Sequence, residues 1–319
     1  MPSDDKSKKW QRGKGWGWIW GKRDEIGALN HITPESVLAA LHAVRLGRIY
    51  DLGVRISRSS FRWPGHSPIE TVTFRSGRGI TQQRDIPAFA ALSAEQQIGF
   101  NSTLILSSDH VGTQVDGLSH FTKGKGQCIY NGFAEDSWGG NWGVRKADAD
   151  SIPPIVARGT LIDVAAAKRV SVLPSRYAIT PKDLQQALEC EKVDIQLGDV
   201  VLIRTGLLSL WGECGEDHEQ LARHDSAGIT LDSARWLVEE KGAVLVGADN
   251  SAVEVVPSPD GKLNPVHVYF LVEQGVHMGE FHYLEELSRD EIYKFTYVAL
   301  TNRIQGTTAG FGMRPIAIT

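Results

Sequence analysis

The stretch His110-Val-Gly-Thr-Gln-Val-Asp-Gly-Leu-Ser-His120 says most about the fold and chemistry of this chain of 319 residues. A straight strand would separate its first histidine from Asp116 by roughly 20 Å, which is too far for both to bind one ion. The segment must therefore bend, and Gly112 and Gly117 supply the backbone freedom. The side chains that could bind a metal all lie at even positions and so on one face of an extended backbone: His110, Gln114, Asp116 and His120.

A bent strand with nitrogen and oxygen donors on its inner face is well suited to hold a divalent metal. Histidine, glutamine and aspartate also occur at this density in turns and packed cores, where they bind no ion. The residue types alone therefore leave both interpretations open.

The composition is that of an ordinary globular protein, with 41% hydrophobic and 23% charged residues. A formal net charge of −4 offers no basic face for nucleic acid. No apolar run is long enough to span a bilayer, and the first nine residues lack the apolar region of a secretory signal. Cys128, Cys190 and Cys214 form no paired pattern. We expect a cytoplasmic protein with reduced thiols that binds a small molecule, and neither nucleic acid nor membrane.

The chain divides into a polar segment, predicted to be a mobile N-terminal arm over residues 1–15, and a single domain over residues 16–319. A tryptophan cluster at positions 10, 16, 18 and 20 is expected to pack against protein. Thr33-Pro34 and Thr180-Pro181 are typical helix starts, with a threonine cap before proline. Helices are expected over 34–46, 181–188, 230–240 and 265–273. Strands are expected over 50–57, 71–74, 104–108, 160–164, 200–205, 243–248 and 291–299.

The histidine-rich stretch resembles the motif His-x-Gly-Thr-His-x-Asp-x-Pro-x-His of the metal-dependent cyclase family, which includes kynurenine formamidase and isatin hydrolase. The sequence departs from that motif at Gln114, where the family usually has histidine, and at Leu118, where it usually has proline. Further stretches resemble the family in the same order along the chain: 20–30, 63–65, 198–206, 247–251, 265–267 and 314–317.

The resemblance implies a mixed α/β fold of the swivelling β/β/α type, with a mixed, partly closed β-sheet and flanking helices. It also implies a homodimer or homotetramer. His110, Asp116, His267 and Glu280 match the family's metal ligands, and His120 matches its general base. Gln114 stands where the second imidazole would be and can still ligate through its side-chain oxygen.

Because an amide adds no charge, we expect one well-held divalent ion, Mn²⁺ or Zn²⁺, and at most a second, weaker one. Asp249 and Ser251 are expected to brace a turn. The predicted substrate contacts are Trp63, His66, Phe121, Trp138 and His282, some of which could equally pack in the core or hydrogen-bond the metal ligands.

Three classes of function follow from the resemblance. The first is a metal-dependent hydrolase that opens a small cyclic amide or lactone, of the isatin, lactam or dienelactone type. The alternative within this class is an arylformamidase that acts on N-formylkynurenine. The second is a cyclase or dehydratase of secondary metabolism. The third is a binding protein without catalysis, which Gln114 keeps open. No Gly-x-Ser-x-Gly elbow or Cys-x-x-Cys pair occurs in the sequence.

Overall fold

The structure, a computed structural model, describes residues 20–211, 218–222 and 225–319. The predicted N-terminal arm, Trp10, Trp16, Trp18 and Cys214 lie outside the described residues. Trp20 packs edge-on against His31, with the two ring centroids 5.1 Å apart.

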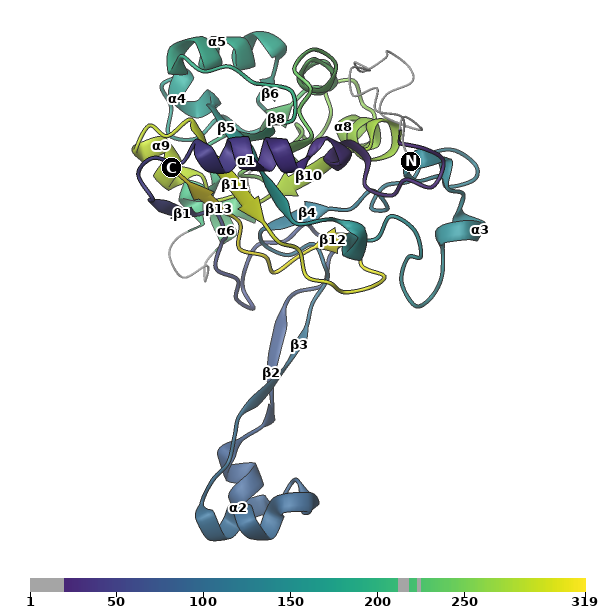
Figure 1. Cartoon of the computed structure of the whole chain (residues 1–319), viewed down its shortest axis with the longest axis vertical. Helices are drawn as coiled ribbons and strands as arrows, with labels where there is room; N and C mark the ends of the chain where they lie inside the picture. Colours follow the sequence, from purple (N-terminus) through teal and green to yellow (C-terminus); the bar gives the residue numbers. More distant parts are fainter. Residues whose placement is uncertain (1–19, 212–217, 223–224) are drawn as a thin grey trace.

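A nine-stranded mixed sheet forms the centre of the body (Figure 1), in the order β1-β13-β11-β5-β7-β9-β10-β4-β12. Strands β5, β7, β9 and β10 run parallel, and the other neighbours are antiparallel. Strands β7 and β9 are apolar apart from Arg204, because both faces of a parallel sheet are covered. The bounds of the strands are β1 Ile49–Asp51, β4 Gln114–Asp116, β5 Ile155–Asp163, β7 Val200–Arg204, β9 Leu245–Ala248, β10 His277–Glu280, β11 Lys294–Ala299, β12 Ala309–Gly310 and β13 Ile316–Ile318.

Helices flank this sheet. Helix α1 (Pro34–His42) packs over β5 and β11, and Thr296 Oγ1 of β11 donates a hydrogen bond to Ala40 O. Helix α5 (Pro181–Glu191) packs against β5 and against α4 and α7. The remaining elements of the body are α3 Glu135–Trp138, α4 Val164–Ala167, β6 Ala178–Ile179, α6 Glu219–Ala222, β8 Gly228–Ile229, α7 Leu231–Arg235, α8 Pro265–His267 and α9 Glu285–Arg289. This arrangement confirms the predicted mixed α/β class.

The predicted helix starts are confirmed. Thr33 and Thr180 each accept a hydrogen bond from the backbone N–H three residues on, and that residue's side chain accepts from the backbone N–H of the threonine. A reciprocal cap of this kind satisfies amide groups that have no partner within the helix.

One predicted helix and one predicted strand are too long, and two predicted helices have nearly the expected length but change type along it. The first helix ends at His42 instead of residue 46. The helices predicted over 230–240 and 265–273 begin as α-helix and continue as wider π-helix, over Trp236–Glu240 and Val268–Gln274. The strand predicted over 50–57 stops at Asp51, because the chain then leaves the sheet and Val54 N donates to Thr113 Oγ1 at 2.9 Å.

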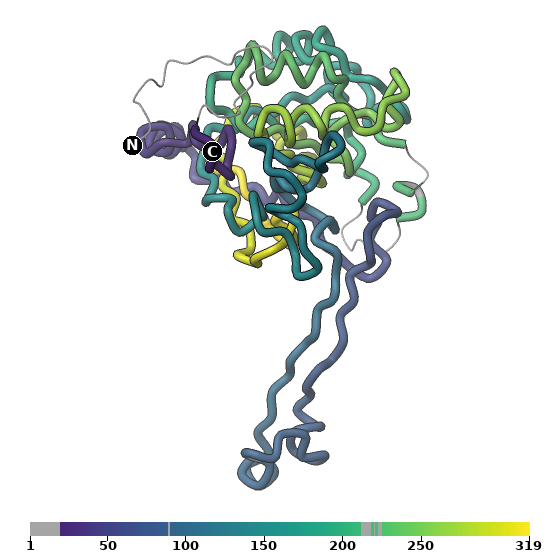
Figure 2. The backbone as a smooth tube through the Cα atoms, turned by 90° about the vertical axis from the view of Figure 1, so that its right-hand side faces the viewer, coloured from purple at the N-terminus to yellow at the C-terminus, as the bar shows by residue number. Residues whose placement is uncertain are grey.

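A long two-stranded ribbon projects from the body and carries a small helical tip (Figures 1 and 2). We call residues 70–106 the projecting hairpin. It consists of β2 (Glu70–Arg75), α2 (Ala90–Gln96), β3 (Ser102–Leu106) and short π and 3₁₀ turns at Gly79–Gln83 and Pro87–Phe89. The sequence predicts its strands within about two residues but gives no sign that they leave the body.

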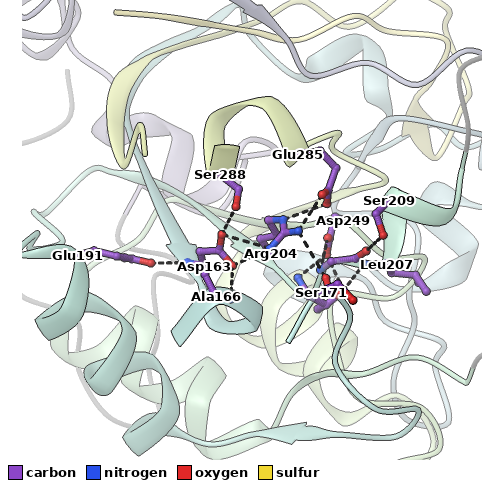
Figure 3. Close-up of polar contacts among 12 residues, drawn as sticks. Asp163, Ala166, Ser171, Glu191, Arg204, Leu207, Ser209, Asp249, Glu285 and Ser288 are labelled. Carbon is purple, nitrogen blue, oxygen red and sulfur yellow. Dashed lines mark hydrogen bonds and ion pairs between the residues drawn. The ribbon is translucent and has the colours of Figure 1, made fainter. Parts of the chain in front are cut away.

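A buried polar network closes the carboxyl ends of β5, β7 and β9 (Figure 3). Arg204 binds Asp163 (Nη1 to Oδ1, 3.0 Å) and Glu285 (Nη2 to Oε2, 2.7 Å). Asp249 accepts hydrogen bonds from Thr205 N, Thr205 Oγ1 and Gly206 N, each at 2.7 Å. Asp249 thus braces the turn after β7, as predicted.

Within the described parts of the chain, no helix combines the length and the apolar character needed to cross a membrane.

Candidate metal centre

The centre is built where β4 pairs with β10. Their antiparallel register places Gln114 opposite Glu280 and Asp116 opposite Met278. Just before β4 the chain turns at Gly112, whose φ of +70° disfavours any residue with a side chain. A Cβ there would also lie 2.5 Å from Ile56 Cδ1. The bend brings His110 Nε2 to 3.5 Å from Asp116 Oδ1, so the predicted folding of this segment is confirmed.

Two groups of potential ligands share Asp116. The first consists of His110, Asp116 and His120, and the second of Asp116, His267 and Glu280. In each group the donor atoms lie within 4.8 Å of one another. His267 Nε2 is 3.6 Å from Glu280 Oε1 and 4.0 Å from Asp116 Oδ2. Residues far apart in the sequence therefore converge as the resemblance implied.

Each of the two outer imidazoles is held by a carboxylate that the sequence analysis missed. His110 Nδ1 donates to Asp109 Oδ1 at 2.9 Å, and His267 Nδ1 donates to Glu254 Oε1. When only Nδ1 carries a proton, Nε2 keeps a lone pair that can bind a metal ion next to Asp116. Asp109 could have been found because it precedes His110 directly, whereas nothing in the sequence pairs Glu254 with His267.

The residues fit a cation. His110 Nε2, Gln114 Oε1 and Asp116 Oδ2 are buried and have no hydrogen-bond partner among the described residues. Buried polar atoms are normally satisfied, so a group of them in one place indicates a bound partner. Nitrogen and oxygen donors of this kind suit Zn²⁺ and Mn²⁺. Gln114 Nε2 is occupied, since it donates to Asp116 Oδ1 at 3.1 Å and to Glu280 Oε2 at 3.0 Å.

The electrostatics of the centre call for positive charge. Burial, together with the neighbouring carboxylate of Asp116, raises the pKa of Glu280 to about 7. Burial also raises the pKa of Asp116. Burial acts against the charged form of His267, but its hydrogen bonds with Glu254 and Glu280 dominate and raise its pKa to about 10. Two carboxylates in so dry a place need a cation close by.

His120 lies beside this cluster. Its ring centroid is 3.9 Å from that of His110 and 5.0 Å from that of Phe121. Burial and the positive charge of the neighbouring histidines lower the pKa of His120 well below its usual range. The side chain therefore stays a neutral imidazole, which is the form that can accept a proton.

A cavity of about 160 Å³ opens onto the centre. The predicted general base His120 and the predicted substrate contacts Trp63, His66 and Phe121 line it. His66 stacks on His110, with the ring centroids 4.7 Å apart. Ala252, Asn264 and Phe281 also line the pocket and were not predicted as site residues. Ser251, which was expected to brace a turn, lines the pocket as well.

Two predicted substrate contacts, Trp138 and His282, do not line this cavity. Trp138 packs against the hydrophobic core outside the pocket, and its Nε1 donates to Gln127 O at 3.0 Å. His282 is fully buried beneath the site, where its Nε2 hydrogen-bonds the Tyr297 hydroxyl at 2.8 Å.

Comparisons with known proteins identify the family and the fold. The Cyclase family model matches residues 50–255. A crystal structure described as a novel cyclase is 30% identical, with a TM-score of 0.80 over 95% of this chain and 99% of that one. Isatin hydrolase A from Labrenzia aggregata, bound to benzyl benzoate, is 17% identical, and its TM-score is 0.60. The match covers 85% of this chain and 94% of that one. An isatin hydrolase bound to the product analogue thioisatinate is 16% identical, and its TM-score is 0.58. The match covers 90% of this chain and 99% of that one. No curated protein sequence matches the chain.

The curled mixed sheet and the buried histidine and carboxylate cluster define a mixed α/β protein with a candidate site for a divalent ion. The extent of the family match and the 30% identity over nearly the whole chain make the relationship specific. The chain belongs to the cyclase family, and both the predicted family and the predicted swivelling fold are confirmed.

Proposed function

We propose that this protein is a metal-dependent hydrolase that cleaves the acyl bond of a small cyclic amide or lactone. The observation that carries the proposal is the pair of ligand groups sharing Asp116 at the bottom of a pocket, with unpartnered buried donors on His110, Gln114 and Asp116. The likeness in fold to isatin hydrolases, proteins whose name states such an activity, supports it.

One divalent ion, Mn²⁺ or Zn²⁺, would be held by residues from β4, β10 and the segments beside them: His110, Gln114, Asp116, His267 and Glu280. When bound, such an ion polarises a carbonyl oxygen and lowers the pKa of water toward about 7. Gln114 favours a single ion. Its amide nitrogen already lies between the two carboxylates, and an amide adds none of the negative charge that two close ions require.

The proton would be handled by His120. This imidazole lines the pocket next to His110 and Phe121, within reach of a substrate that fills the cavity. A positioned imidazole accepts a proton from the attacking water and returns it to the leaving nitrogen or oxygen as the acyl bond breaks. The bond that forms joins the water oxygen to the acyl carbon, so the product is the ring-opened acid.

The pocket favours a compact substrate. A cavity of about 150 Å³ holds a molecule the size of benzene, and the one here is about 160 Å³. Trp63, Phe121 and Phe281 offer aromatic walls to a flat ring. Among the described residues that line the pocket, none is lysine or arginine. The carboxylate of an amino-acid substrate such as N-formylkynurenine would find no lysine or arginine there.

The test combines metal analysis with a substrate panel. Purified protein is expected to contain about one divalent ion per chain, and His110→Ala and Asp116→Ala are expected to lose it. The panel is isatin, a γ-lactam, a dienelactone and N-formylkynurenine, assayed after chelation and after return of Mn²⁺ or Zn²⁺. A product heavier than its substrate by one water is expected for a cyclic member. Full metal content in both variants would refute the site.

Other outcomes would change the proposed reaction. Turnover of N-formylkynurenine alone would replace the substrate class. A product lighter than its substrate by one water would indicate a cyclase or dehydratase. Activity indifferent to chelation and to metal return would remove the metal from the mechanism.

A further inference from the structure

We propose that Asn264 makes this site prefer cyclic amides that carry an N–H group over lactones. The inference rests on the proposed function and narrows its substrate class. Asn264 lies directly before helix α8 and lines the cavity that opens onto the metal centre. Among the described residues that line this cavity, it alone carries a side-chain amide. An amide offers a donor, its NH₂ group, beside an acceptor, its oxygen.

Helix capping does not occupy this amide. An asparagine before a helix normally accepts a hydrogen bond from the backbone N–H of the second or third helical residue. Here those N–H groups belong to Val266 and His267, and both donate to the Glu254 carboxylate, at 3.0 and 3.2 Å. The first helical residue is Pro265, which has no N–H to satisfy. The side chain of Asn264 accordingly makes no cap hydrogen bond.

The amide of Asn264 is free for a ligand. The backbone carbonyl of this half-buried residue accepts a hydrogen bond from Val268 N at 3.2 Å. Its side chain has no hydrogen-bond partner among the residues that the structure describes. A few polar groups on the wall of a pocket commonly fix the orientation of the bound molecule. The amide of Asn264 has the position and the unused hydrogen-bonding capacity for this role.

The backbone at Asn264 is held in an unusual conformation. Its φ of +40° and ψ of +57° lie in the left-handed region, where asparagine is one of the few tolerated residues with a side chain. The residue also precedes a proline, which normally favours extended backbone. Residues held in such conformations cluster at active sites and at segments that clamp a ligand. The local backbone therefore supports a role in binding.

The other polar groups of the cavity do not offer a donor and an acceptor side by side. Outside the two ligand groups, the described residues of the cavity with a polar side chain are Trp63, His66, Ser251 and Asn264. An indole only donates, and a serine hydroxyl donates and accepts at a single oxygen. His66 Nδ1 is already hydrogen-bonded to Ser108 Oγ at 3.0 Å. Asn264 is therefore the residue that can pair with two adjacent groups of a substrate at once.

This amide matches the edge of a lactam. The amide bond of a small ring is cis, so its carbonyl oxygen and its N–H lie on one edge. Asn264 Nδ2 can donate to that oxygen while Oδ1 accepts from the N–H. A lactone has a ring oxygen in place of the N–H, so Oδ1 would face a second acceptor. A site built to hydrogen-bond an N–H discriminates against analogues without one, because its own polar group is left unpaired.

The test compares two probes of the same shape. Oxindole is a bicyclic lactam, and 2-indanone has a CH₂ group where oxindole has its N–H. Ligand-observed NMR gives the Kd of each probe for the purified protein with its metal. Asn264→Gly suits the left-handed backbone and removes the amide, whereas Asn264→Asp keeps Oδ1 and removes the donor. Leu263→Gly is the matched control, because Leu263 is 84% exposed in the same loop and does not line the cavity.

The wild type is expected to bind oxindole at least about tenfold more tightly than 2-indanone. Asn264→Gly should reduce this ratio at least about fivefold, and Leu263→Gly should leave it unchanged. Asn264→Asp should weaken both probes but keep the ratio, since a carboxylate still accepts from the N–H and repels the carbonyl oxygen. A wild type that does not discriminate, or a ratio that is the same in Asn264→Gly, would overturn the inference.

A second readout separates recognition from a structural role. Tm and metal content should be equal in Asn264→Gly and the wild type, because the amide caps no helix. A lower Tm together with an equal fall of the ratio in Leu263→Gly would mark the loop as structural and overturn the inference.

The probes also separate this inference from the proposed function, because 2-indanone has no acyl bond to cleave and Kd requires no turnover. Expected ratios in a protein that hydrolyses no member of the substrate panel would support the role of Asn264 and refute the hydrolase. Hydrolysis of a panel member with an unchanged ratio in Asn264→Gly would refute only the role of Asn264.

Discussion

Glu254 is the most informative residue to change, because it positions a candidate metal ligand without lying in the pocket. Its carboxylate is buried and accepts hydrogen bonds from Val266 N at 3.0 Å, from His267 N at 3.2 Å and from His267 Nδ1. The substitution Glu254→Gln keeps the size of the side chain but removes its charge. The NH₂ group of the new glutamine would also face one of the three N–H groups that donate to Glu254.

The expected effect follows from those contacts. His267 loses the charged acceptor that fixes its Nδ1–H form, so its Nε2 becomes a weaker and less well-oriented donor. Loss of such a partner typically lowers metal affinity ten- to hundredfold, which corresponds to about 1.4 to 2.8 kcal/mol. Binding of the metal ion should become weaker by this amount of free energy, while the fold is retained.

The assay is competition for Zn²⁺ or Mn²⁺ against a chelating dye, which gives the Kd without any substrate. Glu191→Gln is the matched control, because Glu191 is a half-buried carboxylate on α5, far along the chain from every candidate ligand. An unchanged Kd in Glu254→Gln, or an equal rise in both variants, would refute the role assigned to Glu254.

Two further predictions concern stability. Burial raises the pKa of Glu191 to about 8, above the ordinary value of 4.5 that it regains on unfolding. The folded chain therefore binds the proton more tightly than the unfolded chain does. The free energy of unfolding should fall as pH rises from about 4.5 to 8. Glu191→Gln should show a smaller drop in Tm between pH 5.5 and 8.5 than the wild type, and an identical drop would contradict this assignment. Asp249→Ala leaves the buried N–H groups of Thr205 and Gly206 without an acceptor, which should lower the free energy of unfolding by roughly 2 to 6 kcal/mol. Urea denaturation measures this loss, and the exposed Asp232→Ala should cost less than about 0.5 kcal/mol.

Local signals predicted local structure well. A threonine before proline determines where α1 and α5 begin, because the cap needs only neighbouring backbone groups. Helix ends were predicted less well. The change from α- to π-helix after Arg235 and after His267 depends on what each segment packs against, and no nearby residue announces it.

The candidate site was predicted in part. The even spacing and the glycine at position 112 were enough to infer that His110 folds back toward Asp116. The resemblance added His267 and Glu280, which the fold brings to the same place. Trp138 and His282 were misplaced because a side chain near a motif in sequence can point to the core as easily as to the pocket.

The sequence by itself determined the bend, the donor types and the family, since these depend on residues within one short segment and on the order of such segments. Only the tertiary structure decided which carboxylates support the histidines, because Glu254 reaches His267 through a turn of the chain that no periodicity encodes. It also decided that residues 70–106 leave the body. A strand's alternation predicts one apolar face, but what that face packs against is a property of the assembled molecule.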